Sequence, residues 1–392
     1  MASSAGTTST TTSTSAFSQL KVVPAAQPLS PPAFYRPQGS KNPVHWQTDQ
    51  PRGFKSPWDS AKNDGGLFHF LKNRISQRNE FDMPPLPKKG EGLPIVRPAT
   101  WSETGNESAD RHDGQLRVTW IGHAGCHFQI PVPDPTSSSG TRMVNVLTDP
   151  VLSKRCSPFQ FMGPARYTEP CTSIQDMAKS DRAWPDIMVI SHNHYDHLDF
   201  NTIKALVSKP NGRAQPLFFV PLGLKAWFTA QTPELPSEKV VELDWWEERV
   251  VEFSSESQNS ESSDMGRLRF VCAPAQHFSA RSPFDRNQTL WASWAMHVLG
   301  PRSMETSASA TPSTPLPRLW FSGDSGYRWV PGNLPPSEEE SLPHCPAFKE
   351  IGDLLGPFDV AMIACGAYKP RSVFSLIHVS NLIFSFSADD DR

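Results

Sequence analysis

Residues 191–199 read Ser-His-Asn-His-Tyr-Asp-His-Leu-Asp, which places three histidines and an aspartate within a few positions of one another. This stretch follows the apolar run Asp-Ile-Met-Val-Ile at 186–190, which a proline precedes and which is typical of a short buried strand. Imidazole nitrogens and carboxylate oxygens are ligands that zinc accepts, and catalytic zinc sites keep one position open for water. The spacing H-x-H-x-D-H after a buried strand therefore predicts a metal-binding loop.

A helix is expected directly after this loop. Asp199 and Asn201 are both candidates to cap its first turn, and Gly212 lies just past its expected end. Three apolar residues recur at the helical spacing i, i+3, i+4, namely Ile203, Leu206 and Val207. The candidate ligands thus lie between a strand and a helix, where the backbone can direct several side chains to one point.

Composition limits the classes of function. The 392 residues suffice for one large domain or two ordinary ones, and 37% are hydrophobic. A net charge of −3 provides no basic surface for nucleic acid, which argues against a nuclease. The six cysteines are scattered without a C-x-x-C pair, which favours reduced thiols in an intracellular protein. No apolar run reaches the roughly 18 residues of a membrane-spanning helix, and the N-terminus lacks the apolar core of a secretory signal.

The N-terminal third differs from the rest of the chain. Residues 1–52 are rich in Ser and Thr and then in Pro, so we expect a disordered arm, with a mitochondrial transit peptide as the alternative. Residues 53–114 are expected to form an irregular or helical arm. Within it, residues 65–78 form a basic amphipathic pattern that is a candidate membrane-facing helix. The alternative is that this apolar face packs on the domain that follows.

A single hydrolase-like domain is expected over residues 115–379. Short strands are expected at 117–121, 126–130 and 144–147, joined by turns rich in Pro, Ser and Gly. Strand–loop–helix units follow, so we expect an α/β domain (α+β layers) in which helices cover sheets. Low-complexity insertions at 254–266 and 303–317 are expected to be surface loops.

The loop at 191–199 resembles the defining loop of the metallo-β-lactamase superfamily, and further segments narrow the resemblance. These are TWIGHA at 119–124, LTDP at 147–150, MGP at 162–164, VPLGL at 220–224, ELDWWEE at 242–248, AQH at 275–277, GDSGY at 323–327 and GAYKPR at 366–371. Over residues 54–379 the chain resembles the N-acyl-phosphatidylethanolamine-hydrolysing phospholipase D family. The resemblance implies a four-layer αβ/βα sandwich with two metal ions at the edge of the sheets.

The resemblance also implies two Zn²⁺ ions and a set of ligands for each. His192, His194 and His277 would bind the first zinc, and Asp196 with His197 would bind the second. Asp324 would bridge both ions, because one carboxylate offers two oxygens. Asp196 is also the expected catalytic residue, since it can help to orient the attacking hydroxide.

Four further residues are expected around the metals. Asp149 ends a strand in Thr-Asp-Pro, and it is either a hydrogen-bond acceptor for a ligand imidazole or an ordinary turn residue. His123 is either a similar supporting or pocket residue or a loop histidine with no role in the site. The resemblance places Tyr195 and His378 against the substrate.

The chain departs from the family pattern at one ligand. The family takes its last ligand for the second zinc from a histidine in a His-Trp-Gly-type turn, and the chain ends before such a turn. Residues 380–392 do not resemble the family. We therefore expect the last elements of the fold to be missing and the second zinc site to lack a ligand, with His378 as an alternative donor.

The resemblance implies hydrolysis of N-acyl-phosphatidylethanolamine to an N-acylethanolamine and phosphatidic acid. Two alternatives remain open: a related hydrolase of a small lactone or phosphoester, and a truncated, weakly active or inactive product that binds lipid. The expected partner is a membrane phospholipid, with peripheral membrane contact, no nucleic acid and a homodimer as a further option. The expected location is intracellular, either cytoplasmic or peripheral on internal membranes, with the mitochondrion as an alternative.

Overall fold

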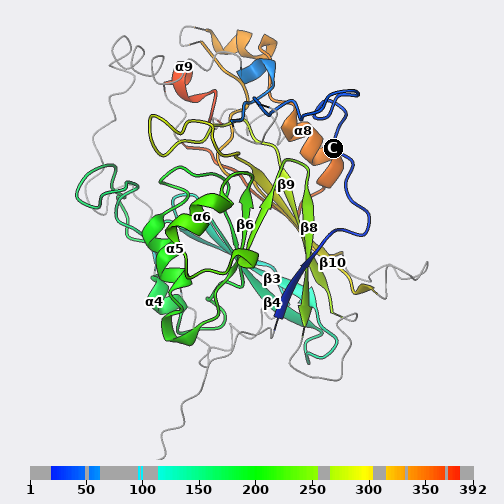
Figure 1. Ribbon diagram of the computed structural model, residues 1–392, viewed down its shortest axis with the longest axis vertical. Coiled ribbons are helices and arrows are strands. Elements are labelled where there is room, and N and C mark those ends of the chain that lie inside the picture. The colour runs from blue at the N-terminus through cyan, green and yellow to red at the C-terminus, as the bar shows by residue number, and fades with distance from the viewer. Residues whose placement is uncertain are drawn as a thin grey trace, which may run out of the picture.

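The computed structural model describes residues 19–48, 53–61, 96–97, 99, 114–254, 265–302, 315–331, 334–366 and 370–379 (Figure 1). Two six-stranded sheets form its centre. Helices cover the outer faces of the sheets, and the metal-binding motif lies where strands from both sheets end. The expected α/β sandwich is confirmed.

The first sheet begins antiparallel and becomes parallel. Its strands, in spatial order, are β2 (Arg117–Gly122), β3 (Gly125–Pro133), β4 (Thr141–Thr148), β5 (Ile187–Val189), β6 (Leu217–Pro221) and β7 (Val240–Leu243). The pairs β2–β3 and β3–β4 are antiparallel, and β4 to β7 run parallel. The carboxyl ends of parallel strands meet at one edge, so the segments that follow β4 and β5 start side by side.

The second sheet is mostly antiparallel. Its spatial order is β1 (Gln19–Val23), β8 (Glu248–Ser254), β9 (Arg267–Ala273), β10 (Ser293–Leu299), β11 (Arg318–Phe321) and β12 (Val360–Met362). Only the pair β11–β12 is parallel. The strands expected at 117–121, 126–130 and 144–147 in the first sheet are confirmed, and so is the apolar strand at 186–190.

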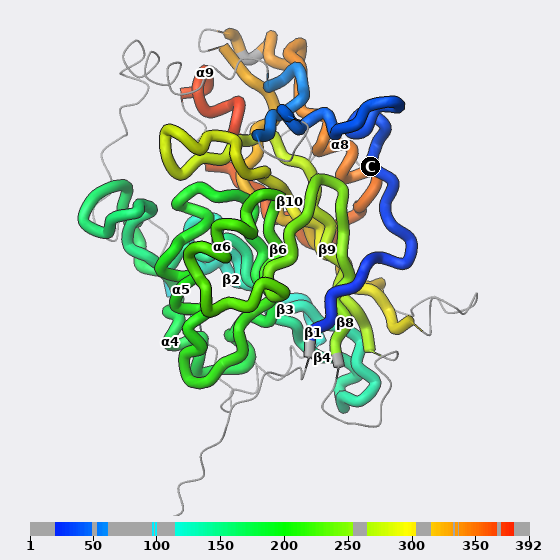
Figure 2. The backbone as a smooth tube through the Cα atoms, viewed as in Figure 1, coloured from blue at the N-terminus to red at the C-terminus, as the bar shows by residue number. Residues whose placement is uncertain are grey.

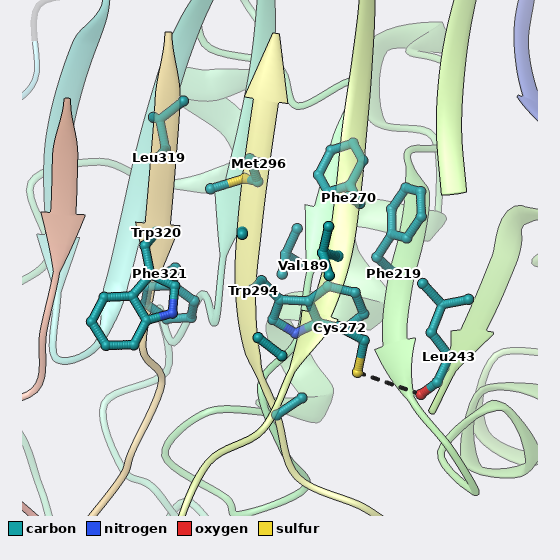
Figure 3. Close-up of a cluster of buried hydrophobic side chains, with 14 of the residues drawn as sticks. Val189, Phe219, Leu243, Phe270, Cys272, Trp294, Met296, Leu319, Trp320 and Phe321 are labelled. Carbon is teal, nitrogen blue, oxygen red and sulfur yellow. Dashed lines mark hydrogen bonds between the residues drawn. The ribbon is translucent and has the colours of Figure 1, made fainter. Parts of the chain in front are cut away.

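Successive side chains along a strand point to opposite faces of the sheet, so the first sheet contributes to two separate hydrophobic cores. In β5, Ile187 and Val189 belong to the core between the two sheets, whereas Met188 belongs to the core beneath the helices. Phe219 of β6 stacks on Phe270 of β9 across the two sheets, with ring centroids 4.2 Å apart (Figure 3). These strands are apolar on both faces because both faces are buried.

Helices complete the outer layers. The first sheet carries α4 (Ile174–Met177), α5 (Phe200–Val207) and α6 (Lys225–Gln231), which lie together on one side of it (Figures 1 and 2). Against the second sheet lies α8 (Ala347–Leu355), and α9 (Arg371–Phe374) follows β12. Short 3₁₀ turns occupy Asp59–Ala61, Pro210–Gly212, Ser237–Lys239 and Pro336–Ser341.

Helix α5 follows the expected pattern with two differences. Ile203, Leu206 and Val207 are buried, as the spacing predicts, and Asp199 is the residue at the cap position. The Asp199 carboxylate, however, accepts hydrogen bonds from Ser153 and the Thr202 hydroxyl rather than from the first turn of the helix backbone. The helix also ends at Val207, well before Gly212, because Pro210 has no N–H to continue it.

The interpretation of residues 1–52 as a disordered arm is wrong for residues 19–48. Strand β1 pairs with β8 over its whole length and forms an edge of the second sheet (Figure 2). Tyr35 is buried, and its hydroxyl donates to Glu350 at 2.6 Å. Local composition hides this order because the partners lie more than 200 residues away along the chain.

Other expectations fall outside the described residues. They are the candidate membrane-facing helix at 65–78, the tail at 380–392 and most of the insertions at 254–266 and 303–317. In the part of the chain that the structure describes, no helix is both long and apolar enough to cross a membrane.

Candidate metal centre

The predicted metal-binding loop at 191–199 follows the carboxyl end of β5. The Ser191 carbonyl oxygen accepts a hydrogen bond at 2.9 Å from the backbone N–H of Ala292, the residue before β10 of the second sheet. A Cβ on Gly323 would clash with the Ser191 side chain, and Gly323 also has a positive φ of 54°. A glycine at position 323 therefore lets the segment that carries Asp324 lie against the loop that carries the histidines.

Three histidines form the first cluster. His192 Nε2 lies 2.8 Å from His194 Nδ1, and His277 Nε2 lies 3.2 Å from the same nitrogen. Burial lowers the pKa of His194 to about 4 and lowers the pKa values of His192 and His277 well below the usual value. All three imidazoles are therefore neutral at neutral pH, which is the form that binds metal.

A second cluster shares Asp324 with the first. The Asp324 Oδ2 atom lies 3.1 Å from His197 Nε2, 3.0 Å from His378 Nε2 and 3.9 Å from His277 Nε2. Asp196 approaches from the other side, with its Oδ2 atom 3.9 Å from His197 Nε2. Asp324 thus lies between the two groups of donors, at the position expected of a bridging carboxylate.

The charges in this cluster depend on one another. Burial alone would raise the pKa of Asp324 and Asp196, but His197 holds both pKa values well below the usual range. Burial likewise acts against a charged His197, yet Asp324 and Asp196 raise its pKa well above the usual value. Two ionised carboxylates held among imidazoles are a strongly cation-attracting arrangement.

Asp149 contacts the second cluster through His197 and the start of the loop through Ser191. Its buried carboxylate accepts hydrogen bonds from Ser191 N at 2.7 Å, Ser191 Oγ at 2.5 Å and His197 Nδ1 at 2.7 Å. Burial raises the pKa of Asp149, and the hydrogen bonds from His197 and Ser191 oppose this rise. With Asp149 as the acceptor, His197 carries a proton on Nδ1, which directs its Nε2 towards Asp324. Asp149 therefore contacts the imidazole of His197, and the role of that imidazole as a metal ligand stays a prediction.

The remaining predicted residues line cavities beside the clusters. His123 Nε2 lies 3.0 Å from Asp196 Oδ2, and the His123 backbone adopts a positive φ of 49°. A cavity of about 370 Å³ is lined by His123, Asp324 and His378, and one of about 660 Å³ by His123, His194 and Tyr195. Trp120, His123 and Asp196 line both cavities, so the two cavities lie next to each other beside the clusters.

Two supporting residues were missed by reasoning from sequence. Arg281 donates to the carbonyl oxygens of Asn193 and Leu198 at 2.8 and 2.9 Å, and its guanidinium lies over the Tyr195 ring at 4.0 Å. It therefore braces the metal-binding loop at both ends. No short-range pattern marks this arginine, because its partners lie more than 80 residues away.

Gln276 is the second supporting residue. Its side chain accepts from Ser60 Oγ at 2.5 Å and donates to the Leu376 carbonyl oxygen at 2.9 Å. Its backbone N–H donates to Ser325 Oγ at 3.0 Å. Gln276 thus joins the segments that carry His277, Asp324 and His378, and its place beside His277 in the sequence was the only available signal.

The chain is similar in sequence to known proteins over most of its length. Residues 144–382 match the family model described as a Beta-lactamase superfamily domain. N-acyl-phosphatidylethanolamine-hydrolyzing phospholipase D 1 of Caenorhabditis elegans is 34% identical over 336 residues, which cover 85% of this chain and 74% of that protein.

Two other relatives are matched over shorter stretches. An uncharacterized protein of Mycobacterium tuberculosis is 35% identical over 254 residues, or 65% of this chain, and the match spans only 50% of that protein's length. The mitochondrial N-acyl-phosphatidylethanolamine-hydrolyzing phospholipase D of Saccharomyces cerevisiae is 30% identical over 209 residues, which cover 53% of this chain and 34% of that protein.

Proposed function

Since the chain belongs to the N-acyl-phosphatidylethanolamine-hydrolysing phospholipase D family of the β-lactamase superfamily, we propose that it is a zinc-dependent phosphodiesterase acting on N-acyl-phosphatidylethanolamine. The products would be an N-acylethanolamine and phosphatidic acid. The observation that carries the proposal is the position of Asp324, whose carboxylate lies between a cluster of neutral histidines and a charged cluster. The nematode and yeast relatives, by their names, hydrolyse this lipid.

The donor atoms fit a pair of zinc ions. The ring nitrogens of His192, His194 and His277 lie within 4.8 Å of one another, and neutral imidazole is a preferred zinc ligand. Asp196 and His197 would hold the second ion, with Asp324 shared between the two. Zinc in such a pair lowers the pKa of water and neutralises the charge on phosphate oxygens.

His378 is the candidate for a further donor to the second ion. Its Nε2 atom contacts the same Asp324 oxygen as His197 does, and it forms a possible ligand group with His277 and Asp324. The family resemblance implies that His378 contacts the substrate. Its position beside Asp324 suits that role and also suits a metal ligand. Zinc content of a His378→Ala variant separates these roles.

The chain's own residues would orient the reactants. Asp196 lies at the mouth of both cavities, where its ionised carboxylate can accept a hydrogen bond from the attacking water. His123 and His197 flank Asp196 and limit its movement. Tyr195, held by the Arg281 guanidinium, lines the larger cavity, where it would contact the lipid. Water would attack phosphorus, and the bond between phosphorus and the oxygen of the N-acylethanolamine group would break. The leaving oxygen would take up the proton released by the attacking water, which gives the N-acylethanolamine as an alcohol and phosphatidic acid without a protein nucleophile.

Two supporting features concern the substrate and its location. Apolar side chains, including Trp120, Val151 and Ala165, line the larger cavity and favour a lipid over a small polar ester. The yeast relative is named as mitochondrial, which supports a location peripheral to internal membranes, including those of mitochondria.

The test combines metal content with product analysis. The purified, dialysed chain is expected to contain about two zinc ions by elemental mass spectrometry and to release N-acylethanolamine and phosphatidic acid from lipid in mixed micelles. A His194→Ala variant should lose the first zinc and the activity. Release of a free fatty acid or of a glycerol phosphodiester would contradict the proposed bond cleavage. Hydrolysis of a lactone alone, with the lipid intact, would favour the small-substrate alternative.

A further inference from the structure

A finger of chain projects beside the mouth of the larger cavity. Between β4 and α4, residues 153–168 double back on themselves, with Arg155 bridging to Ala165 and Cys156 N donating to the Pro164 carbonyl at 3.1 Å. Residues 164–168 line the cavity together with His194 and Asp196. In Figure 1 the finger stands away from the sheets on the side of α5. We call the segment 157–163 its tip.

The tip exposes large apolar side chains that nothing in the described chain covers. Phe159 is 51% exposed, Phe161 80% and Met162 58%. Burying large apolar side chains away from water is favourable, so two phenylalanines and a methionine on one small tip indicate a surface that is covered in use. Single exposed apolar residues occur on every protein, but a cluster beside a catalytic mouth is unusual.

Hydrogen bonds within the finger hold these side chains outward. The Gln160 side chain accepts from Arg155 N at 3.1 Å and donates to the Arg155 carbonyl at 3.0 Å. Arg155 Nη1 donates to the Gly163 carbonyl at 2.5 Å. The rings of Phe159 and Phe161 lie against each other with centroids 5.4 Å apart. The tip is therefore preorganised, so little conformational entropy is lost when it is buried.

The finger itself is basic. It carries Lys154, Arg155 and Arg166, and residues 153–168 include no aspartate or glutamate. The nearest acidic residues lie at its base, where Glu169 follows directly and Asp199 accepts hydrogen bonds from Ser153. Phe284, 93% exposed, stands on a second turn that follows Ala280, another residue that lines the same cavity. Apolar tips combined with basic residues match the interface of a bilayer that contains anionic lipid.

We propose that the finger at 153–168, with Phe159 and Phe161 at its tip, inserts into the surface of an anionic phospholipid membrane and brings the catalytic mouth to the lipid. The proposal rests on the proposed function, because a lipid substrate is what makes docking useful. It assigns membrane contact to a described segment that is distinct from the amphipathic stretch at 65–78. The rings would sit at the level of the acyl chains, and the basic residues among the headgroups.

The first experiment measures vesicle binding. The full chain is mixed with vesicles of phosphatidylcholine and phosphatidylserine in a 70:30 ratio, and the bound fraction is measured by sedimentation. A Phe159→Ser/Phe161→Ser variant should bind roughly 100-fold more weakly. Leu354→Ser is the matched control, because Leu354 is a comparably exposed apolar residue (41%) on α8 and should bind as the parent does. Lys154→Glu should weaken binding to these vesicles but not to vesicles of phosphatidylcholine alone.

The second experiment separates docking from catalysis. A short-chain, water-soluble N-acyl-phosphatidylethanolamine needs no membrane, so the double variant should hydrolyse it at the parent's rate while losing activity on vesicles. Equal vesicle binding by the parent and the double variant, or no binding by the parent, would overturn the docking proposal. If the parent binds vesicles through these residues but hydrolyses neither substrate, the docking stands and the proposed function fails.

Discussion

Replacing Asp149 with asparagine should weaken binding of the second metal while leaving most of the fold intact. In the parent, both carboxylate oxygens accept hydrogen bonds, Oδ1 from Ser191 N and Oδ2 from Ser191 Oγ and His197 Nδ1. An amide has one accepting oxygen and one donating nitrogen. One of the two buried N–H groups, Ser191 N–H or His197 Nδ1–H, must therefore face another donor.

A change of tautomer in His197 would relieve this contact between two donors. If the imidazole proton moves from Nδ1 to Nε2, the conflict with the amide disappears, but Nε2 then points a hydrogen at Asp324 and cannot bind metal. Loss of such a supporting group typically costs 10–100-fold in metal affinity, which corresponds to about 1.4–2.7 kcal/mol. Keeping the proton on Nδ1 instead would cost about 1–3 kcal/mol for an unsatisfied buried donor.

The assay is a competition titration of zinc against a chelator of known affinity, with zinc per chain measured after dialysis. The chain provides a matched control in Asp244, another buried carboxylate. It accepts from His45 Nε2 at 2.7 Å, Trp245 N at 2.8 Å and Trp46 Nε1 at 3.1 Å, remote from the metal centre. Asp244→Asn should cost similar stability but leave zinc affinity unchanged. Parent-like zinc binding by Asp149→Asn, or equal zinc loss in both variants, would refute the reasoning.

Four further predictions concern stability and support of the site. Leu206→Ala, in the buried face of α5, should lower the free energy of unfolding in urea by about 2–5 kcal/mol, and a loss below 1 kcal/mol would mean that the site collapses around the gap. Burial lowers the pKa of His127 to about 4 from the ordinary 6.5, so the unfolded chain binds the extra proton as pH falls. The contribution of His127 to the free energy of unfolding is therefore complete above about pH 6.5 and falls by roughly 3 kcal/mol as the pH is lowered to about 4. Urea titrations at several pH values should show a shallower decline of the unfolding free energy for His127→Gln. Gln276→Ala should leave Ser60 Oγ and the Leu376 carbonyl oxygen without their hydrogen-bond partner and lower zinc affinity roughly tenfold. The control Ser60→Ala should lower only the midpoint of thermal unfolding. Equal zinc affinities in both variants would contradict the role of Gln276 as a link between the segments that carry the predicted ligands. Removing zinc with a chelator should lower the free energy of unfolding by about 2.7 kcal/mol when the parent is measured at a free zinc concentration 100 times its dissociation constant, and a melting temperature insensitive to zinc would contradict metal binding by the folded chain.

The sequence predicts best those features of the fold that depend on residues close together in the chain. The apolar run before the loop is strand β5, and the spacing of Ile203, Leu206 and Val207 locates the buried face of α5. The H-x-H-x-D-H spacing likewise identifies residues that the structure brings into two adjoining clusters, because one tight loop positions them all.

What sequence reasoning missed depends on distant partners. The order of residues 19–48 comes from pairing with β8 and from the Tyr35–Glu350 hydrogen bond, neither of which leaves a mark on the local composition. Arg281 and Gln276 support the site through contacts with residues that lie 49 to 216 positions away in the sequence. The approach of His378 to Asp324 likewise follows from the packing of the chain after β12. The sequence alone predicts either contact with substrate or a further metal donor for this histidine.

The pairing of β1 with β8 has a consequence for maturation of the protein. Removing residues 19–23 would uncover the hydrogen-bonding groups of β8 and leave an unprotected edge that can pair with another molecule. Proteolytic trimming of the N-terminal region that keeps this edge covered must therefore cut before Gln19. Shortened versions prepared for crystallisation face the same boundary, and those that start later should precipitate even though every metal-binding residue is retained.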